Sequence, residues 1–320
     1  MINIYKIEQS DFKSKMMKIF LILLSVVVFS SCKEGTKKTS YPVYKVNLDQ
    51  PDQIVPSDLF TRVSAIPLET TAKSHFILGE LGVKGERYYI LDRNQQLFLC
   101  FDQNGKFKYT LNNKPKNKGQ LKSILNPEAY YYQKKWFYYL MFRNEVYTRD
   151  KEGKKHTAYQ WDFGPYNDDK ETILRFPPLS PQIVAQIQQS WLKANCDFKL
   201  SDARQSQNYI YTRLERIFHD SLQATQPTLY HLVCHKSTGK CYYFNQFSDG
   251  TSFTQSVRLE EDCILMLLPW WEKEKFENLT ILDDESRQVI QKMKDTDNPV
   301  LLKWHLKITN KQAGNLKDKK

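Results

Sequence analysis

The feature that most constrains the fold of this chain is a recurring unit of short apolar strands separated by tight polar turns. One unit spans residues 88–111 and turns at 102–105, and a second spans 136–161 and turns at 150–153. A third copy spans 229–244. Asn and Gly in such turns tolerate positive φ angles, and apolar alternation is typical of strands. The pattern predicts antiparallel β meanders.

The interval between the units predicts how the meanders are assembled. Gly105 and Gly153, which close equivalent turns, are 48 residues apart. Four-stranded propeller blades repeat every ~40–50 residues. Blades arranged around an axis leave only short, protected sheet edges. We therefore expect an all-β propeller, and the poor strand pattern between 161 and 208 leaves open that one blade is degenerate or missing.

Two short helical insertions are expected among the strands. Ser180 and Pro181 supply an N-cap and a first helical turn. We expect this helix to pack on the propeller, with a partner-binding helix as the alternative. A second helix, at residues 284–294, is expected to pack as well.

The strand expected at residues 300–308 is placed to close the propeller. Propellers commonly complete one blade with strands from both ends of the chain. Residues 41–48 and residues 61–67 are alternative partners for this closing strand.

Residues 16–32 have the pattern of an export signal. A basic start precedes an apolar run from Ile19 to Phe29, and small residues then precede Cys32. The run is about half the ~20 residues that a membrane-spanning helix needs, so it is typical of a signal-peptide core. The Ser-Ser-Cys ending is similar to a lipoprotein signal, which implies diacylation of Cys32. An ordinary secreted protein is the alternative.

The export signal divides the chain into four segments. We expect a signal peptide at 1–31, a flexible tether at 32–40, a propeller at 41–310 and a basic tail at 311–320. Translation beginning at Met16 or Met17 is an open alternative. The expected location is the cell envelope, anchored by lipid to the outer membrane on its periplasmic or surface face.

The composition is that of a basic, folded protein. Hydrophobic residues make up 41% of the chain, and the formal net charge is +11. Lysines gather in a loop at 114–122 and near the C-terminal end. Nucleic acid is not an expected partner outside the cytoplasm, so we interpret these lysines as solvated or as facing an anionic surface.

Five colinear segments carry a family resemblance. They read VSAIPLETT (63–71), LGE (78–80), YILD (89–92), FDQNGK (101–106) and NPVL (298–301). In order and spacing they resemble the six-bladed β-propeller lipoproteins of Gram-negative, Bacteroides-type bacteria over residues 41–309. The resemblance implies the fold and the location and carries no established activity. The loop at 113–120 departs from the glycine-rich segment usual in that family.

Cysteine usage does not indicate a disulfide scaffold. Beyond Cys32 an odd number of cysteines is scattered through apolar segments, and we expect buried free thiols, with oxidation of an accessible pair in an exported protein as the alternative. These are Cys100, Cys196, Cys234, Cys241 and Cys263.

A metal site near the third unit is not expected. His231 and His235 share a strand face but lie about 13 Å apart, because a strand rises ~3.3 Å per residue. A three-residue turn after this strand pairs His235 with Cys241, which leaves Cys234 opposite Tyr242. At most two ligands then converge, whereas zinc takes three or four. The same register places Cys234 and Cys241 on opposite faces, and we expect neither a metal nor a cofactor.

No catalytic residue is predicted. Adjacent carboxylates at 168–169, 260–262 and 283–285 are more typical of solvated turns than of acid–base pairs. Trp270 and Trp271 follow Pro269 at a strand end, where an exposed indole can stack on a sugar or a peptide. Core packing is the alternative for these and the other aromatic residues.

The sequence therefore predicts an envelope binding or scaffold module for a protein or a glycan, with Trp270 and Trp271 as candidate binding residues. The alternative is a hydrolase or lyase that acts on a glycan or peptide in the central channel. A channel site of that kind requires at least two carboxylates or a histidine to converge there.

Overall fold

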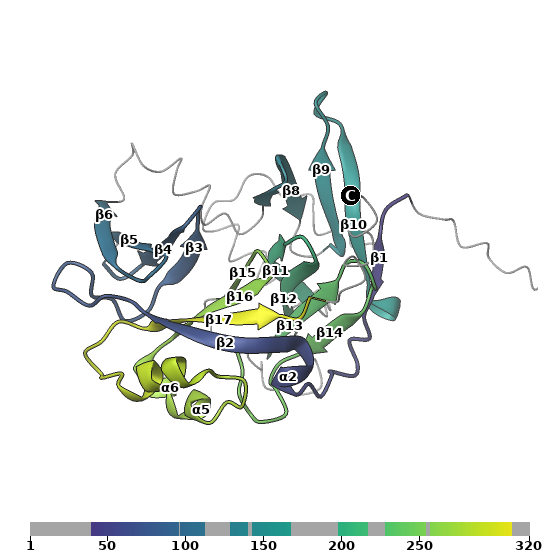
Figure 1. Cartoon of the computed structure of the whole chain (residues 1–320). Helices are drawn as coiled ribbons and strands as arrows, with labels where there is room; N and C mark the ends of the chain where they lie inside the picture. Colours follow the sequence, from purple (N-terminus) through teal and green to yellow (C-terminus); the bar gives the residue numbers. More distant parts are fainter. Residues whose placement is uncertain are drawn as a thin grey trace, which may run out of the picture. The chain divides into compact units, whose positions relative to one another are not determined.

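The structure is a computed structural model that describes residues 40–95, 97–112, 129–139, 143–167, 198–216, 228–253 and 257–308. Tyr41–Lys320 form one compact unit, which holds all the elements below (Figure 1). The predicted signal peptide, Cys32 and almost all of the tether lie outside the described residues.

The described residues form four sheets, and in each of them three or four successive strands form a meander. The first contains β3 (Glu80–Val83), β4 (Arg87–Asp92), β5 (Leu97–Asp102) and β6 (Phe107–Asn112). The second contains β7 (Ala129–Tyr132), β8 (Lys135–Tyr139), β9 (Glu145–Arg149) and β10 (Lys155–Asp162). The third contains β11 (Phe198–Gln205), β12 (Tyr209–Arg216), β13 (Thr228–His235) and β14 (Cys241–Phe244). The fourth contains β15 (Val257–Glu260), β16 (Cys263–Leu268), β17 (Val300–Leu306) and β2 (Phe60–Pro67).

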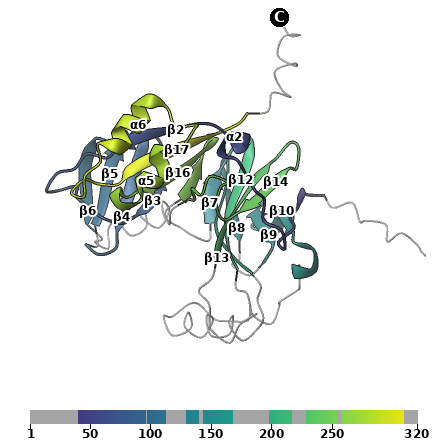
Figure 2. The same ribbon diagram turned by 90° about the horizontal axis from the view of Figure 1, so that it is seen from below.

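The first strands of these sheets lie side by side. Strand β7 lies beside β11, β11 beside β15, and β15 beside β3. Figure 1 and Figure 2 show the sheets from two directions. Meanders that start from neighbouring inner strands are the blades of a propeller. The predicted all-β propeller with short helical insertions is confirmed, with four blades in the described part of the chain. Of the stretch at 161–208 that is expected to be poor in strands, residues 198–205 form β11, whereas 168–197, with the helix expected at Ser180, lie outside that part.

The ring is closed by strand β2. It pairs antiparallel with β17, from Pro67 opposite Val300 to Val63 opposite Trp304. Of the two predicted partners for the closing strand, residues 61–67 are therefore correct. The other candidate forms β1 (Val43–Lys45), which instead adds to the second sheet, parallel to β10.

The helices are short and lie between strands. They are α2 (Pro56–Leu59), η2 (Gly164–Tyr166), η4 (Trp270–Glu272), α5 (Glu274–Glu277) and α6 (Asp284–Gln291). The predicted helix before the closing strand is confirmed as α6, whose N-cap Asp283 accepts a hydrogen bond from the Ser286 amide at 2.8 Å. The Ala65 amide of β2 donates to the Ser286 hydroxyl at 2.7 Å, which attaches the helix to the closed blade. None of the helices described here combines the length and apolar character needed to span a bilayer.

The closed blade buries an aromatic cluster. Trp304 of β17 is fully buried, and its ring centroid lies 5.1–5.2 Å from those of Phe60, Phe247 and Phe253. Phe60 comes from β2, so ring closure and core packing depend on the same two strands. Aromatic pairs at these distances contribute beyond the area that they bury.

Asn298 joins the two ends of the propeller. Its side-chain oxygen accepts from the Phe76 amide at 2.9 Å, and its side-chain nitrogen donates to the carbonyls of Glu69 and Ser74 at 2.9 and 3.0 Å. Its own amide donates to the Thr70 hydroxyl at 2.8 Å. Asn298 is 2% exposed, so these groups have little access to water. We call this set of bonds the Asn298 clasp.

A second contact brings the 102–105 turn to the same place. The Glu69 amide donates to the Gly105 carbonyl at 2.9 Å, and the Phe107 amide donates to the Glu69 carboxylate at 2.9 Å. Gly105 has φ of +78°, and a Cβ there would overlap the Pro67 carbonyl oxygen. Only glycine fits this close approach. Three of the segments that carry the family resemblance therefore meet in space.

The predicted register of the third unit is wrong. Cys234 lies directly opposite Cys241, and the two form a disulfide. The His235 amide bonds to the Lys240 carbonyl, so the turn has one residue more than expected. A shift of one residue moves every side chain to the other face, which brings the two sulfurs together. The expectation of free thiols holds for Cys100 and Cys263 and fails for this pair.

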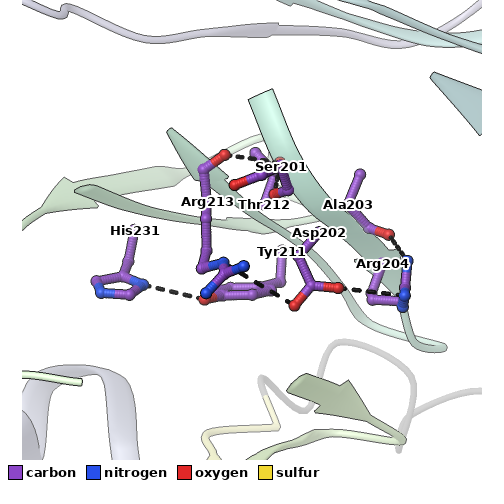
Figure 3. Close-up of polar contacts among 8 residues, drawn as sticks. All are labelled: Ser201, Asp202, Ala203, Arg204, Tyr211, Thr212, Arg213 and His231. Carbon is purple, nitrogen blue, oxygen red and sulfur yellow. Dashed lines mark hydrogen bonds and ion pairs between the residues drawn. The ribbon is translucent and has the colours of Figure 1, made fainter. Parts of the chain in front are cut away.

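His231 lies on the opposite face of β13 from the disulfide and is buried. Its Nδ1 lies 3.0 Å from the Tyr211 hydroxyl (Figure 3). Burial, and then the charge of Arg213, lower the pKa of His231 to about 3, so the ring is neutral at ordinary pH. No group of three metal-ligating side chains occurs within the described ranges.

We expect Asn298→Ala to lower the free energy of unfolding by about 2–4 kcal/mol, because three buried backbone groups lose their partner. Asn298→Asp keeps the side-chain oxygen that accepts from Phe76 but replaces the donating nitrogen with a second oxygen. This oxygen faces the carbonyls of Glu69 and Ser74, so the variant should also be destabilised. Urea unfolding measures both effects. The control is Asn94→Ala in an exposed turn, for which we expect a change within about 0.5 kcal/mol. Equal stability of Asn298→Ala and the control would show that the clasp contributes nothing.

We expect the stability of the protein to fall on acidification partly through His231. The unfolded chain binds a proton near pH 6.5 and the folded ring only near pH 3, so stability decreases as pH falls through this window. Between pH 7 and pH 5 the loss from this residue is about 2 kcal/mol. In His231→Phe the pH dependence measured by urea unfolding should shrink by that amount. An unchanged slope, or a His231 NMR signal that titrates above pH 5, would contradict the assignment.

Candidate functional site

A cavity of about 760 Å³ lies where β3 and β15 begin, beside the middle of β11. Its walls include Ile77, Leu78, Phe253 and Trp271, and Arg213 and Arg258 contribute charge. Cavities of ~300–1,000 Å³ that combine apolar walls with a few polar groups are typical of small-molecule sites. We call it the Trp271 cavity.

The structure places one of the two predicted binding residues on this cavity. Strand β16 ends at Leu268, and Pro269 leads directly into η4, which begins at Trp270. Trp271 lines the cavity, and its ring meets that of Trp270 edge to face at 5.9 Å. Trp270 and Trp271 are 41% and 45% exposed, so each presents part of its indole to solvent.

Two aliphatic residues of the lining also expose apolar surface. Ile77 and Leu78, which precede β3, are 56% and 50% exposed. Gly79 follows them at a position where a Cβ would overlap the Ile90 side chain, so the chain approaches β4 closely there. Exposed aliphatic side chains that border a cavity are suited to ligand contact.

The floor of the cavity is built around Asp202. This residue has φ of +55° and lies in a bulge of β11, where the pairing with β12 shifts. Its carboxylate lies 3.2 Å from the Arg204 guanidinium and 4.0 Å from Arg213 Nε, between the two (Figure 3). Arg204 also donates to the Ala203 carbonyl at 2.6 Å. Bulges re-aim side chains, and here one brings a carboxylate between two arginines.

A third arginine joins the floor from another blade. Burial and the nearby charge of Arg204 lower the pKa of Arg258 to about 10, while Asp202 and Glu260 oppose that shift. Arg258 remains protonated at neutral pH. For Arg213, burial lowers the pKa, but Asp202 together with Tyr211, Glu215 and Tyr139 outweighs burial, so its pKa is raised. We call Arg204, Arg213 and Arg258 the arginine floor.

The charges at the mouth of the cavity are balanced. Arg93 forms an ion pair with Glu80, and Lys275 forms one with Glu272 at 2.6 Å. All four side chains line the cavity. Asp202 is the remaining carboxylate among the described lining residues, and it lies between Arg204 and Arg213.

A second cavity of about 1450 Å³ lies at the other ends of the inner strands and shares Arg204 and Arg258 with the first. The predicted carboxylate run at 260–262 lines it. Asp262 accepts hydrogen bonds from Ser206 and from the Asn208 side chain at 2.5 and 2.6 Å, which is a structural role. Burial raises the pKa of Glu260, with Arg258 opposing.

The second cavity also contains a cysteine next to a histidine. Cys263 Sγ lies 3.3 Å from His305 Nδ1, and the Ser64 hydroxyl lies 3.0 Å from His305 Nε2. Burial raises the pKa of the Cys263 thiol and lowers that of His305. Both groups are therefore held neutral, whereas a nucleophilic cysteine needs a lowered pKa.

Sequence reasoning missed the arginine floor. Its members lie on β11, β12 and β15 and are separated in the chain by up to 54 residues. The signal in the sequence that could have indicated these arginines is the presence of a charged residue inside strands that are otherwise largely apolar. That signal does not reveal which arginines share one cavity.

Comparisons with known proteins agree with the fold. Residues 34–119 match the DUF5128 family, described as a 6-bladed beta-propeller. A candidate exported protein of Bacteroides fragilis has a similar structure, with a TM-score of 0.57 and 12% identity over 84% of this chain and 100% of that one. No curated protein matches the sequence.

Two further solved structures are more distant. A Bacteroides vulgatus member of the DUF4221 family has a TM-score of 0.25 and 9% identity over 79% of this chain and 98% of that one. A streptogramin B lyase has a TM-score of 0.19 and 9% identity over 66% and 70%. Neither score supports a structural comparison. The predicted resemblance is confirmed by the match of residues 34–119 to a family described as a 6-bladed beta-propeller, and the fold of this chain is a β-propeller.

Proposed function

We propose that this protein is an exported, lipid-anchored β-propeller that binds a ligand in the Trp271 cavity. The observation that carries the proposal is the half-exposed Trp271 on the wall of a cavity of small-molecule size. In small-molecule sites, apolar walls commonly supply the contact area and a few polar groups fix the orientation of the ligand. The Trp271 cavity has both kinds of lining.

Two observations support export and anchoring. The pattern at residues 16–32 is that of a signal peptide with a lipoprotein-type cysteine. The structurally similar Bacteroides fragilis protein is itself a candidate exported protein. Diacylation of Cys32 would hold the propeller at the outer membrane, with the 32–40 tether between lipid and fold.

Binding fits the Trp271 cavity better than catalysis. Its carboxylates Glu80, Asp202 and Glu272 are each ion-paired, an arrangement that orients charge. The second candidate function, a hydrolase or lyase, is favoured by one observation in the other cavity, the raised pKa of Glu260, which lines that cavity. Cleavage of a glycan or peptide that is lost in Glu260→Gln would favour this alternative.

We expect Trp271→Ala, alone and with Trp270→Ala, to weaken ligand binding at least tenfold, because the indole wall of the cavity is removed. Glycan and peptide arrays probed with the purified protein identify the ligand, and titration measures the affinity. Trp136→Ala is the control, because Trp136 is also 39% exposed but lies on the second cavity. Unchanged binding by a correctly folded double variant would refute a role for this cavity.

We expect Cys32→Ala to release the protein from the membrane fraction, because the variant lacks the acceptor of the lipid. Mass spectrometry of the N-terminal peptide should find a diacylated Cys32 in the native protein. The control is Cys100→Ala, which removes a buried free thiol inside the propeller. An unmodified N-terminal peptide in the membrane fraction would show that the anchor is wrong.

A further inference from the structure

We propose that one end of the second sheet, the sheet of β7 to β10, docks on anionic lipid headgroups of the membrane that holds the protein. Docking of this kind rests on the proposed function, through the lipid anchor at Cys32, and specifies which surface of the propeller faces the bilayer. Its support comes from charge, from exposed aromatic rings and from the place where the chain enters the fold.

Two turns of the second sheet lie at the same end of it. The pairing of β7 with β8 ends at Tyr132 opposite Lys135, and the pairing of β9 with β10 ends at Arg149 opposite Lys155. Strands β8 and β9 are also antiparallel. Successive strands of a meander reverse direction, so its first and third turns share one edge. We call these two turns, with the strand ends beside them, the basic end of the second sheet.

The basic end has a surplus of positive charge. Six basic side chains stand there against two acidic ones, which leaves a net charge of +4. All eight are exposed, and they are Lys134, Lys135, Arg149, Lys151, Lys154 and Lys155 with Asp150 and Glu152. One of the two carboxylates, that of Asp150, lies 2.6 Å from His156 Nε2. Clusters of lysine and arginine of this kind are attracted to anionic lipid surfaces.

Exposed aromatic rings border the basic end. Tyr131 and Trp136 lie directly opposite each other, one residue pair before the β7–β8 turn, and their ring centroids are 5.3 Å apart. They are 59% and 39% exposed. Tyrosine and tryptophan are enriched at the headgroup level of membranes, because they combine an apolar ring with a polar group.

The core of the propeller does not account for these two rings. Side chains alternate between the faces of a strand, and Tyr130 and Tyr139 lie on the other face of β7 and β8. Those two residues are 5% and 2% exposed and pack in the core between the second and third sheets. Tyr131 and Trp136 therefore belong to the face that is turned away from the third sheet.

The chain enters the fold from the side of the basic end. Strand β1 runs parallel to β10, with Val43 opposite Gln160, and the Gln160 amide donates to the Pro42 carbonyl at 3.0 Å (Figure 1). Residues just before Val43 therefore lie toward the start of β10, where the 150–154 turn is. Cys32 precedes Tyr41 by nine residues. An extended chain of that length spans at most roughly 30 Å, so a lipid on Cys32 keeps this side of the propeller near the bilayer.

The same end of the fourth sheet has the opposite charge. The β15–β16 turn contains Glu260, Glu261 and Asp262, which line the second cavity together with Tyr132 and Gln133 of the β7–β8 turn. An anionic surface repels these carboxylates. We therefore expect the propeller to dock by the second sheet rather than by all of its inner-strand ends.

Lysine labelling tests the proposal with the native protein reconstituted into vesicles. Vesicles of neutral phosphatidylcholine are compared with vesicles that also contain about 30% phosphatidylglycerol, an anionic lipid. Acetic anhydride, which is uncharged, acetylates exposed amines, and mass spectrometry measures the rate at each lysine. We expect Lys134, Lys135, Lys151 and Lys154 to react about threefold or more slowly on the anionic vesicles. About 1 M salt should remove the difference, because the screening length is then about 3 Å.

Charge reversal locates the surface. The double variant Lys151→Glu with Lys154→Glu should lose the slowing at Lys134 and Lys135, although these two lysines are unchanged. The matched control reverses the charge of two lysines that are exposed after α6, and it should keep the slowing; it is Lys292→Glu with Lys294→Glu. In the native protein, these two control lysines should react equally fast on both kinds of vesicle.

Equal labelling on the two kinds of vesicle would overturn the docking surface, as would equal slowing at Lys292 and Lys294. Slowing that persists at Lys134 and Lys135 in the Lys151→Glu, Lys154→Glu variant would overturn it too. Slowing in native membranes but not on protein-free anionic vesicles would show that a protein or a glycan covers the basic end instead.

The anchor is judged separately by the mass of the N-terminal peptide. A diacylated Cys32 together with equal labelling refutes the docking surface and leaves the proposed function intact. An unmodified Cys32 refutes the anchor whatever the labelling shows.

Discussion

The structure depends on the closure of the ring by two strands that lie more than two hundred residues apart in the chain. Strand β2 hydrogen-bonds along β17 and buries Phe60 against Trp304. The Asn298 clasp then fixes the chain that leaves β2 to the chain that enters β17. Long-range pairing of this kind costs loop-closure entropy, which the buried aromatic cluster and the clasp offset.

The candidate site is a consequence of this closure. Closure places β15 of the last described blade beside β3 of the first. Ile77 and Leu78 before β3 and Arg258 at the start of β15 then border one cavity. The turn after β16 adds Trp271 to the same cavity. A change that opens the closed blade would therefore remove the site together with the fold.

Charge in the site is arranged in two layers. At the mouth, Arg93 pairs with Glu80 and Lys275 pairs with Glu272, so the opposite charges of each pair nearly cancel. The floor holds three guanidinium groups in a partly buried setting, where the pKa of Arg258 is lowered by burial and by the charge of Arg204, while the pKa of Arg213 is raised.

The sequence by itself determined the strands, the turns and the propeller class, because alternation and glycine turns are local patterns that survive in the fold. It offered Trp270 and Trp271, which follow Pro269 at a strand end, as candidates for exposed indoles, with core packing as the alternative. It did not determine the register at Cys234 and Cys241, where one turn residue reverses the faces. The tertiary structure alone decided which arginines share a cavity, because their proximity arises from the packing of separate blades and leaves no mark in local sequence.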